Sequence, residues 1–478
     1  MKKTKIIISV IAALLVIILP FTAVPIIAYS LPTVFDNTFV GALDDKVDRL
    51  ASIEEEKIII VGGSSVAFGI DSELIEKYTG MPVVNFGLYA ALGTKLMLDL
   101  SEPYVNEGDV VVIAPELDAQ TLSLYFNSAT TARALDGSPE LLTRVKLSNL
   151  FSVLSSSWGL AKEKIEYLNK GDKPNPEGVY NAKSFDEYGD ISYVREENTM
   201  KLFYDPNTPI RLLPETFDAE FVDYLNKYIR KCERRGATVL FSFCPMNELA
   251  VTEDSDPAAF EEFIRENIDA TLISSIGDYI RPAGYFYDSN FHANDAGVKA
   301  HTVALTRDLL LELGIPVAVT EDVPEPPELK EFDIIDIKGD DPNAEMFTFT
   351  ALPNGAYEIS GVKEEYKGEK VLTLPRSYDG YKALTLGEGA LSGCAVEKLI
   401  IPEDTYLTSL KNGCFAGTSS LREIVIYFST YSTEESIMPP ANFFGTHPDL
   451  VVYVPEGSNY RDDYYWRERG LTFATIEE

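Results

Sequence analysis

The stretch Lys57-Ile58-Ile59-Ile60-Val61-Gly62-Gly63-Ser64-Ser65 decides the fold that we expect for this chain. Its unbroken apolar run, 58–61, is typical of a strand buried on both faces of a parallel sheet. The glycines and serines that follow predict a tight turn at the carboxyl end of this strand. Ligands of open parallel sheets bind at such ends, so a serine hydroxyl there can face a cleft.

Strand-like runs alternate with amphipathic helical segments from about residue 55 to residue 315. This alternation predicts an α/β domain in which helices cover both faces of a parallel sheet. We expect strands at 57–61, 83–86, 109–114, 238–243 and 285–287. We expect helices at 72–78, 96–103, 221–235, 257–267 and 296–313.

The alternation stops between Gln120 and Pro214. A long excursion inside a compact domain is usually functional, and we expect 120–214 to form a cap over the carboxyl ends of the strands. Helices are expected at 139–154 and 159–169. Tyr193, Arg195 and Asn198 are candidates to line this cap.

The N-terminus carries a targeting signal. Three lysines precede the uncharged stretch from Ile6 to Ser30, which is long enough to cross a hydrocarbon core of about 30 Å as a helix. We therefore expect residues 1–31 to be a transmembrane anchor, 32–54 a juxtamembrane linker, and the remainder to lie outside the cell. Because Pro20 and Pro25 interrupt the stretch, a cleaved signal peptide and a secreted protein are the alternative.

The composition excludes some classes of partner. With 75 acidic and 41 basic residues the net charge is -34, which argues against nucleic-acid binding and favours solubility outside the cell. The four cysteines (Cys232, Cys244, Cys394 and Cys414) have no CxxC spacing and are expected to be buried thiols. No metal and no organic cofactor is expected.

A second domain follows Gly314. Residues 316–345 are rich in proline and acidic side chains, which is typical of a semi-rigid linker. Beyond it, 414–426 repeats the pattern of 390–401, and a weaker copy runs from 443–446 to 450–454. Repeats of this length that end in a strand-like run predict a solenoid of stacked strands.

These repeats resemble bacterial surface leucine-rich repeats of the BspA type, over about residues 350–460. Their aromatic-x-Gly-Cys/Thr turn is followed by Leu-x-x-Ile-x-Ile, and Pro402 and Pro455 match the end of the unit. The resemblance implies that residues 346–470 form a leucine-rich-repeat domain that binds a surface or a partner protein. Cys394 and Cys414 would be turn and core residues, and His447 a surface residue.

Residues 55–315 resemble the SGNH (GDSL-like) hydrolase and acyltransferase superfamily, and in particular its cell-surface members that act in polymer O-acylation and D-alanylation. The resemblance implies a flavodoxin-like three-layer fold with four short motifs. Gly62-Gly63-Ser64 corresponds to the first motif, Gly-Asp-Ser, which makes Ser64 the nucleophile. A shift by one residue makes it Ser65, and a purely structural alternative is that both serines cap the following helix.

The second and third motifs supply oxyanion donors in this superfamily. Asn85-Phe86-Gly87-Leu88-Tyr89-Ala90 resembles the second, which implies a main-chain donor at Ala90 with Gly87 beside it. The third, Gly-x-Asn-Asp, is replaced by Ala114-Pro115-Glu116-Leu117-Asp118. An ionised Glu116 cannot donate a hydrogen bond, although it can orient a polar acceptor; Asn247 is a candidate substitute donor.

The fourth motif, Asp-x-x-His, corresponds to the segment that contains Asp288 and His292. Asp288 precedes His292 by four residues and Asn290 precedes it by two. The resemblance implies that Asp288 orients the imidazole and that His292 is the general base. The downstream Asn294-Asp295-x-Gly297 is expected to open a helix, and His301 within that helix to be a packed or surface residue.

Together these features predict a membrane-anchored, extracytoplasmic acyl esterase or O-acyltransferase. Its substrate would be an acylated cell-envelope or host glycan or cell-wall polymer, and the repeats would be a binding module. The main alternative is a catalytically inactive SGNH-like domain in a surface-displayed binding protein, which the missing third motif favours. A further alternative is a component that assembles with an integral-membrane acyl donor.

Overall fold

The computed structural model describes two compact units of the chain. The first comprises residues 23–171, 173–176, 178–196, 210–285 and 291–326. The second comprises 209, 286–290, 327–328, 341–351, 357–376, 378, 383–402, 407, 409–411, 413–427, 447, 449–456, 458, 460 and 471–476. Most of the expected anchor, residues 1–22, lies outside these ranges. No helix within them is long and apolar enough to cross a membrane.

The first unit is built on a five-stranded sheet whose strands are all parallel. In spatial order the strands are β2 (Val83–Gly87), β1 (Ile58–Gly62), β3 (Val110–Ile113), β4 (Thr238–Phe241) and β6 (Thr271–Leu272). Counted along the chain, this is the order 2-1-3-4-5 of flavodoxin-like doubly wound sheets. The predicted α/β class with a parallel sheet is therefore confirmed.

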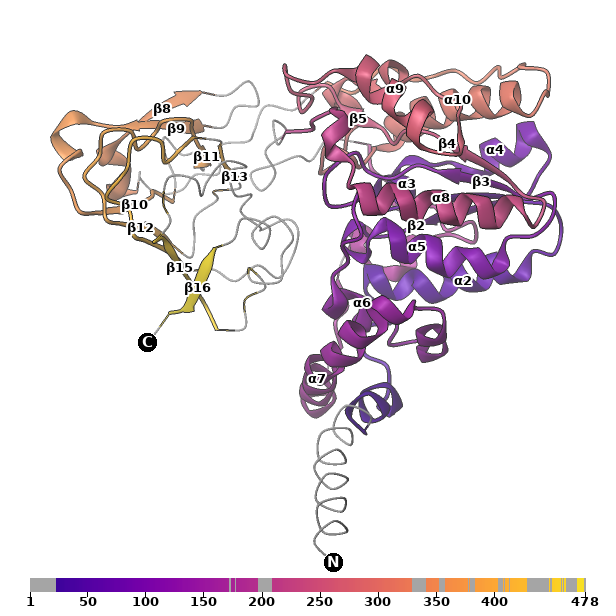
Figure 1. The fold of residues 1–478 in the computed structure, drawn as a ribbon, viewed down its shortest axis with the longest axis horizontal. Helices are drawn as coiled ribbons and strands as arrows, with labels where there is room; N and C mark the ends of the chain where they lie inside the picture. The colour runs from indigo at the N-terminus through magenta and orange to yellow at the C-terminus, as the bar shows by residue number, and fades with distance from the viewer. Residues whose placement is uncertain are drawn as a thin grey trace, which may run out of the picture. The chain divides into compact units, whose positions relative to one another are not determined.

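Helices cover both faces of this sheet, which explains why β1, β2 and β3 are buried at every residue. One face carries α3 (Ser64–Gly69), α4 (Ser72–Thr79) and α10 (Asp295–Glu312), which contact one another. The other carries α2 (Leu43–Ser52), α5 (Thr94–Ser101) and α8 (Ala219–Glu233). Figure 1 shows α4 and α10 on one side of the strands and α2 and α5 on the other.

The remaining elements of the first unit flank the sheet. They are the helices α6 (Ser128–Ala134), α7 (Leu147–Lys170) and α9 (Pro257–Asn267), and a separate parallel pair, β5 (Met246–Asn247) with β7 (Ile280–Arg281). Short 3-10 helices are η1 (Phe39–Ala42), η2 (Ala90–Leu92), η3 (Glu102–Tyr104), η4 (Pro139–Thr143), η5 (Gly178–Tyr180), η6 (Ala182–Ser184), η7 (Pro214–Thr216), η8 (Ile276–Asp278) and η9 (Ala283–Tyr285).

Three expectations about these elements are wrong. The strand expected at 285–287 is the end of η9 followed by an isolated bridge and a bend, and the fifth strand of the sheet is β6 instead. The two helices expected at 139–154 and 159–169 are η4 and one continuous helix, α7. Residues 39–52, expected within a linker, form η1 and α2, and α2 packs on β2 and α5.

The second unit contains two mainly parallel sheets. One is all parallel, in the order β10 (Val371–Thr373), β12 (Lys398–Ile401), β14 (Glu423–Ile426), β15 (Val451–Val454) and β16 (Thr472–Thr475). The other runs β13 (Ser409–Leu410), β11 (Ala383–Leu386), β9 (Tyr357–Val362) and β8 (Phe347–Ala351), with only β8 and β9 antiparallel. Two 3-10 helices, η10 (Pro342–Met346) and η11 (Glu364–Tyr366), complete its described elements.

The core of this unit is a column of equivalent apolar residues. Leu372 lies beside Leu399, Leu399 beside Ile424, and Ile424 beside Val452, all buried. Cys394 and Cys414 are buried free thiols, as expected. His447 was expected on the surface, but it is buried. Its Nε2 atom lies 2.8 Å from the Thr418 carbonyl oxygen, which gives the buried ring a polar partner. The weaker repeat at 443–446 lies outside the described residues.

Candidate active site

Two glycines, Gly62 and Gly87, allow close packing around the turn that carries Ser64. β1 ends at Gly62 and α3 begins at Ser64, so Ser64 lies at the carboxyl end of a central strand. A Cβ atom on Gly62 would lie 2.5 Å from the Ala114 carbonyl oxygen, and one on Gly87 would lie 2.7 Å from the Gly63 carbonyl oxygen. Only glycine permits such close approach of two backbones.

Ser64 forms a hydrogen bond with the predicted base. The Ser64 Oγ atom lies 2.8 Å from His292 Nε2, although the two residues are 228 positions apart. This distance is within the range that a general base needs to take a hydroxyl proton. Ser64 is 7 % exposed and His292 is half-buried. The structure therefore brings together the two residues that the sequence places after the first strand and near the end of the domain.

Phe68 packs on the imidazole, and Arg195 packs on Phe68 in turn. The His292 ring stacks on Phe68, with ring centroids 3.9 Å apart and planes 5° apart. The Arg195 guanidinium lies 5.3 Å from the Phe68 ring centre, and Arg195 Nε donates to the Ala293 carbonyl oxygen at 3.2 Å. Arg195 was expected to line the cap, but the role of Phe68 was missed. Its position four residues after Ser64 on one helix was the available signal.

The residues on either side of His292 are placed as follows. Asn294 caps α10, because its Oδ1 atom accepts from the Gly297 N–H at 3.0 Å, as the helix-opening prediction requires. Asp288 and Asn290 belong to the segment 286–290, which groups with the second unit. The role of Asp288 as the residue that orients the imidazole stays a prediction.

Glu116 contacts the same turn. Its Oε1 atom accepts from the Ser65 N–H at 2.8 Å and lies 3.3 Å from Ser64 Oγ. The carboxylate also lies against Gly63, where a Cβ atom would approach Oε2 to 2.3 Å. Glu116 is 2 % exposed, and among the described residues no nitrogen or oxygen pairs with its Oε2 atom. The carboxylate therefore covers the backbone N–H next to Ser64.

Ser65, the alternative nucleophile, points elsewhere. It is fully buried, and among the described residues its hydroxyl has no hydrogen-bond partner. Burial, and after it the nearby Glu116 carboxylate, raise the pKa of Cys244 well above its ordinary value, so this thiol stays protonated. Neither serine caps α3, since Gly63 occupies the N-cap position and no side chain bonds there. The helix-capping alternative for the two serines is thus not what this part of the structure shows.

A buried polar network centred on Asn85 of β2 holds α3, the helix that begins at Ser64. Asn85 Nδ2 donates to the Val66 carbonyl oxygen at 2.9 Å and to Asp190 Oδ1 at 2.8 Å. Lys46 Nζ donates to the Asn85 carbonyl oxygen at 3.0 Å. Burial lowers the pKa of Lys46 and raises the pKa of Asp190. The network ties residue 190 of the insertion to β2 and α3, and sequence reasoning missed it because its members are far apart in the chain.

Ala90 and Asn247, expected as oxyanion donors, are placed as follows. Ala90 is half-buried at the start of η2, and its carbonyl oxygen accepts from the Gly93 N–H at 2.9 Å. Gly87 ends β2 and donates its N–H to Asn85 Oδ1 at 3.1 Å. Asn247 is buried in β5 and accepts from the Leu249 N–H at 3.1 Å. The donor roles of these three residues stay predictions.

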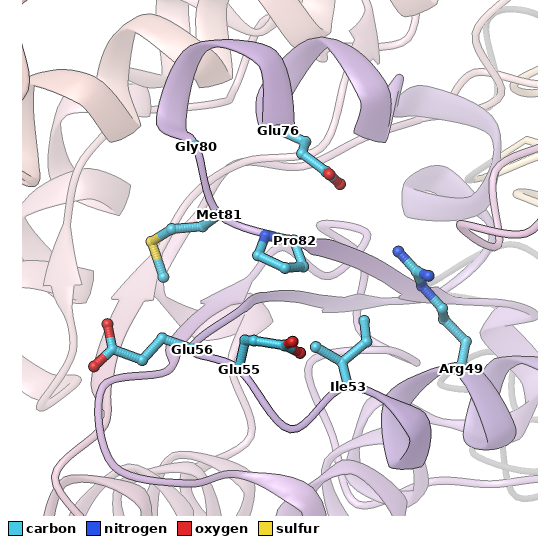
Figure 2. A pocket seen from close by; sticks show the side chains of 8 residues that line it. All are labelled: Arg49, Ile53, Glu55, Glu56, Glu76, Gly80, Met81 and Pro82. Carbon is cyan, nitrogen blue, oxygen red and sulfur yellow. The ribbon is translucent and has the colours of Figure 1, made fainter.

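An open hollow lies away from Ser64. It has a volume of about 610 Å³ and is open to solvent. Figure 2 shows its lining by Arg49, Ile53, Glu55, Glu56, Glu76, Gly80, Met81 and Pro82. Glu56 precedes β1 and Pro82 precedes β2, so the hollow lies at the amino ends of the strands. Ser64 follows the carboxyl end of β1, and ligands of parallel sheets bind at that opposite edge.

Within the described ranges, no group of three or more His, Cys, Asp or Glu side chains is arranged to hold a metal ion. Comparisons of the chain with protein-family models, with curated proteins and with solved structures give no significant match.

Proposed function

We propose that the first unit is an SGNH-like serine acyl esterase or O-acyltransferase. The observation that carries this proposal is the 2.8 Å contact between Ser64 Oγ and His292 Nε2 at the carboxyl edge of the sheet. The strand order and the chain order of serine and histidine support the resemblance to the SGNH superfamily. Asp288 would complete a triad by orienting the imidazole.

In the proposed reaction Ser64 Oγ attacks the acyl carbonyl carbon while its proton moves to His292 Nε2. The tetrahedral intermediate collapses, the alkoxide leaving group takes the proton from Nε2, and the acyl group stays on Ser64. A water molecule or an acceptor hydroxyl then attacks the acyl-serine and gives its proton to Nε2. The Ser64 oxygen finally leaves and takes that proton, which restores the free enzyme.

The proposed substrate is an acylated cell-envelope or host glycan. This assignment follows the resemblance to cell-surface members of the superfamily and the expected anchor that places the unit outside the cell. We propose further that the second unit is a BspA-type leucine-rich-repeat solenoid that binds a surface polymer or a partner protein. The register of its five parallel strands supports a stacked-repeat architecture.

The position of Glu116 favours a second candidate function, in which the first unit is an inactive domain of a surface-displayed binding protein. Its carboxylate accepts from the Ser65 N–H, a donor that would otherwise be available to an oxyanion. Two like charges 4 Å apart repel by about 4 kcal/mol at an effective dielectric constant of about 20, so the carboxylate must move before an oxyanion forms there. A carboxylate that never moves would leave an inactive domain within a surface-displayed binding protein.

A serine-directed probe separates the two candidates. The full-length protein in detergent is incubated with a fluorophosphonate, beside Ser64→Ala, Ser65→Ala and His292→Ala. We expect labelling of the wild type and of Ser65→Ala, and no labelling of the other two variants. Ser65→Ala is the matched control, because it makes the same change one residue away from the proposed nucleophile.

Glu116→Gln tests whether the charge of the Glu116 carboxylate slows the reaction of Ser64 with the probe. The amide keeps the size of the side chain but removes the like charge next to the developing oxyanion, so we expect the labelling rate to rise about tenfold or more. The thermal midpoint is expected to change little, because the lost bond is offset by the removal of a buried charge. Labelling that falls in Glu116→Gln would instead make Glu116 a residue that positions Ser64. If neither the wild type nor Glu116→Gln is labelled although both are folded, the esterase proposal is contradicted and the binding function is favoured.

A further inference from the structure

The helix α7 in the insertion exposes an apolar stripe. Leu147, Phe151, Trp158 and Ile165 are separated by intervals of 4, 7 and 7 residues, which place them within about 40° of one another around a helix with 3.6 residues per turn. Their exposed fractions are 84 %, 67 %, 52 % and 46 %. Large contiguous apolar surfaces are uncommon on soluble domains and mark interaction sites.

The opposite face of α7 is firmly held by the first unit. Lys164 is fully buried and forms an ion pair with Asp136, and Arg133 binds both oxygens of Glu163 at 2.7 and 2.9 Å. Val153 and Leu160 on this face are also buried. These contacts fix the rotation of the helix, so the stripe stays turned outward from the unit.

The opposite, packed face of α7 contacts the point where the described chain begins. Lys164 Nζ donates to the Leu31 carbonyl oxygen at 2.9 Å, and Tyr167 packs edge-on against Phe35 with ring centres 6.1 Å apart. Figure 1 shows α7 next to the first helical segment, residues 23–30. In that segment Ile26 and Ile27 are 66 % and 51 % exposed. The uncharged stretch expected to enter the membrane ends at Ser30.

The local charge differs from that of the whole protein. Between residues 144 and 173 the chain carries six basic residues (Arg144, Lys146, Lys162, Lys164, Lys170 and Lys173) and three acidic ones (Glu163, Glu166 and Asp172). Four of the lysines, 146, 164, 170 and 173, form ion pairs with carboxylates, and Lys164 is buried. The net charge of the chain is -34. A helix with basic flanks and with Trp, Phe and Leu on its other face is typical of segments that lie in the headgroup region of a bilayer.

We propose that α7 docks on the lipid bilayer, with its apolar stripe inserted among the headgroups next to the anchor. The proposal rests on the membrane anchoring expected for residues 1–31 and is independent of the chemistry at Ser64. A helix of this kind buries its apolar face about 5–10 Å into the headgroup and acyl boundary. With two attachment points, the first unit would hold one orientation on the membrane.

Trp158 provides a reporter within the stripe. The chain has two tryptophans, so Trp466→Phe leaves Trp158 as the only one. This full-length variant is reconstituted into phosphatidylcholine–phosphatidylglycerol vesicles with or without lipids brominated at carbons 6 and 7. We expect the protein to float with the vesicles, its emission to shift to shorter wavelength, and most of that emission to be lost in brominated vesicles.

The double variant Leu147→Asp, Ile165→Asp is expected to float but to lose most of the quenching. Leu311→Asp is the matched control: Leu311 is 74 % exposed on α10, far from α7 in Figure 1, and this variant should be quenched like the parent. If the Trp466→Phe protein floats but is not quenched, the docking of α7 is overturned while the anchor stands. A blue shift without quenching that grows with protein concentration would show a second copy on the stripe and also overturn it. Failure to float would overturn the anchor and this inference together, while leaving the fluorophosphonate result untouched.

Discussion

Ser64 and Ser65 differ in environment although they are neighbours in the chain. Successive side chains on a helix point about 100° apart. Ser64 consequently meets His292, whereas Ser65 is turned into the interior toward Cys244. The difference depends on where α3 begins, and a sequence motif cannot fix that start to one residue.

His301 should make stability depend on pH. It is fully buried, with Nδ1 2.7 Å from the Gly69 carbonyl oxygen, and burial lowers its pKa from 6.5 to about 4. The unfolded chain therefore binds a proton between pH 6.5 and 4 that the folded chain rejects. From this group we expect the free energy of unfolding to fall by about 3 kcal/mol as the pH drops from 7 to 4. Urea unfolding at both pH values measures the fall.

A comparison of variants isolates that contribution. His301→Gln should be less stable at pH 7, because it loses packing, but its stability should fall less toward pH 4. An equal slope in His301→Gln would show that His301 does not carry the pH dependence.

At the scale of single elements, two glycines in helices have opposite surroundings. Gly159 lies within α7 with no atom near the position of a Cβ atom, whereas a Cβ atom on Gly297 in α10 would lie 2.1 Å from the Tyr285 carbonyl oxygen. We expect Gly159→Ala to raise the free energy of unfolding by about 0.5–1 kcal/mol, because alanine restricts the unfolded chain. Gly297→Ala should lower it by about 1–3 kcal/mol through the clash. Chemical unfolding of both variants checks the signs, and a gain in Gly297→Ala would contradict the packing described for α10.

Elements could be predicted from the sequence where local pattern and tertiary packing agree. β1 to β4 lie within two residues of their expected bounds, because strands buried on both faces are apolar throughout. β6 was missed because two residues, Thr271–Leu272, are too short to show a period. The aromatic residues near Tyr285 suggested a strand, although a 3-10 turn packs them there. The sequence predicted two helices, 139–154 and 159–169, where the structure has one continuous helix, α7, packed on α6.

The candidate site was predictable only in part. Ser64 and His292 follow from motifs, since each has small or helix-opening neighbours. The contact of Glu116 with the Ser65 N–H could not be foreseen, because it depends on the register of β1 against β3, which places Ala114 beside Gly62. Phe68 and the network of Asn85 and Asp190 likewise depend on packing between segments distant in sequence.

At the scale of the whole molecule, the dominant property is charge. A net charge of -34 spread over 478 residues makes the folded chain repel itself. Raising the ionic strength from about 0.01 M to 0.15 M shortens the screening length from about 30 Å to about 8 Å. We therefore expect the thermal midpoint to rise over this range, by the same amount in sodium and potassium chloride. A midpoint that stays constant or falls in scanning calorimetry would show that the ion pairs stabilise more than the net charge destabilises.

The 228-residue separation of Ser64 and His292 has a consequence for biosynthesis. All three histidines of the chain lie beyond residue 291, so the first 291 residues contain no imidazole at all. While the ribosome elongates this part, Ser64 is an ordinary alcohol, and a nascent chain has no partner for it. If Ser64 and His292 act as proposed, a product truncated before residue 292 contains the serine but not the histidine, and we expect it not to hydrolyse esters.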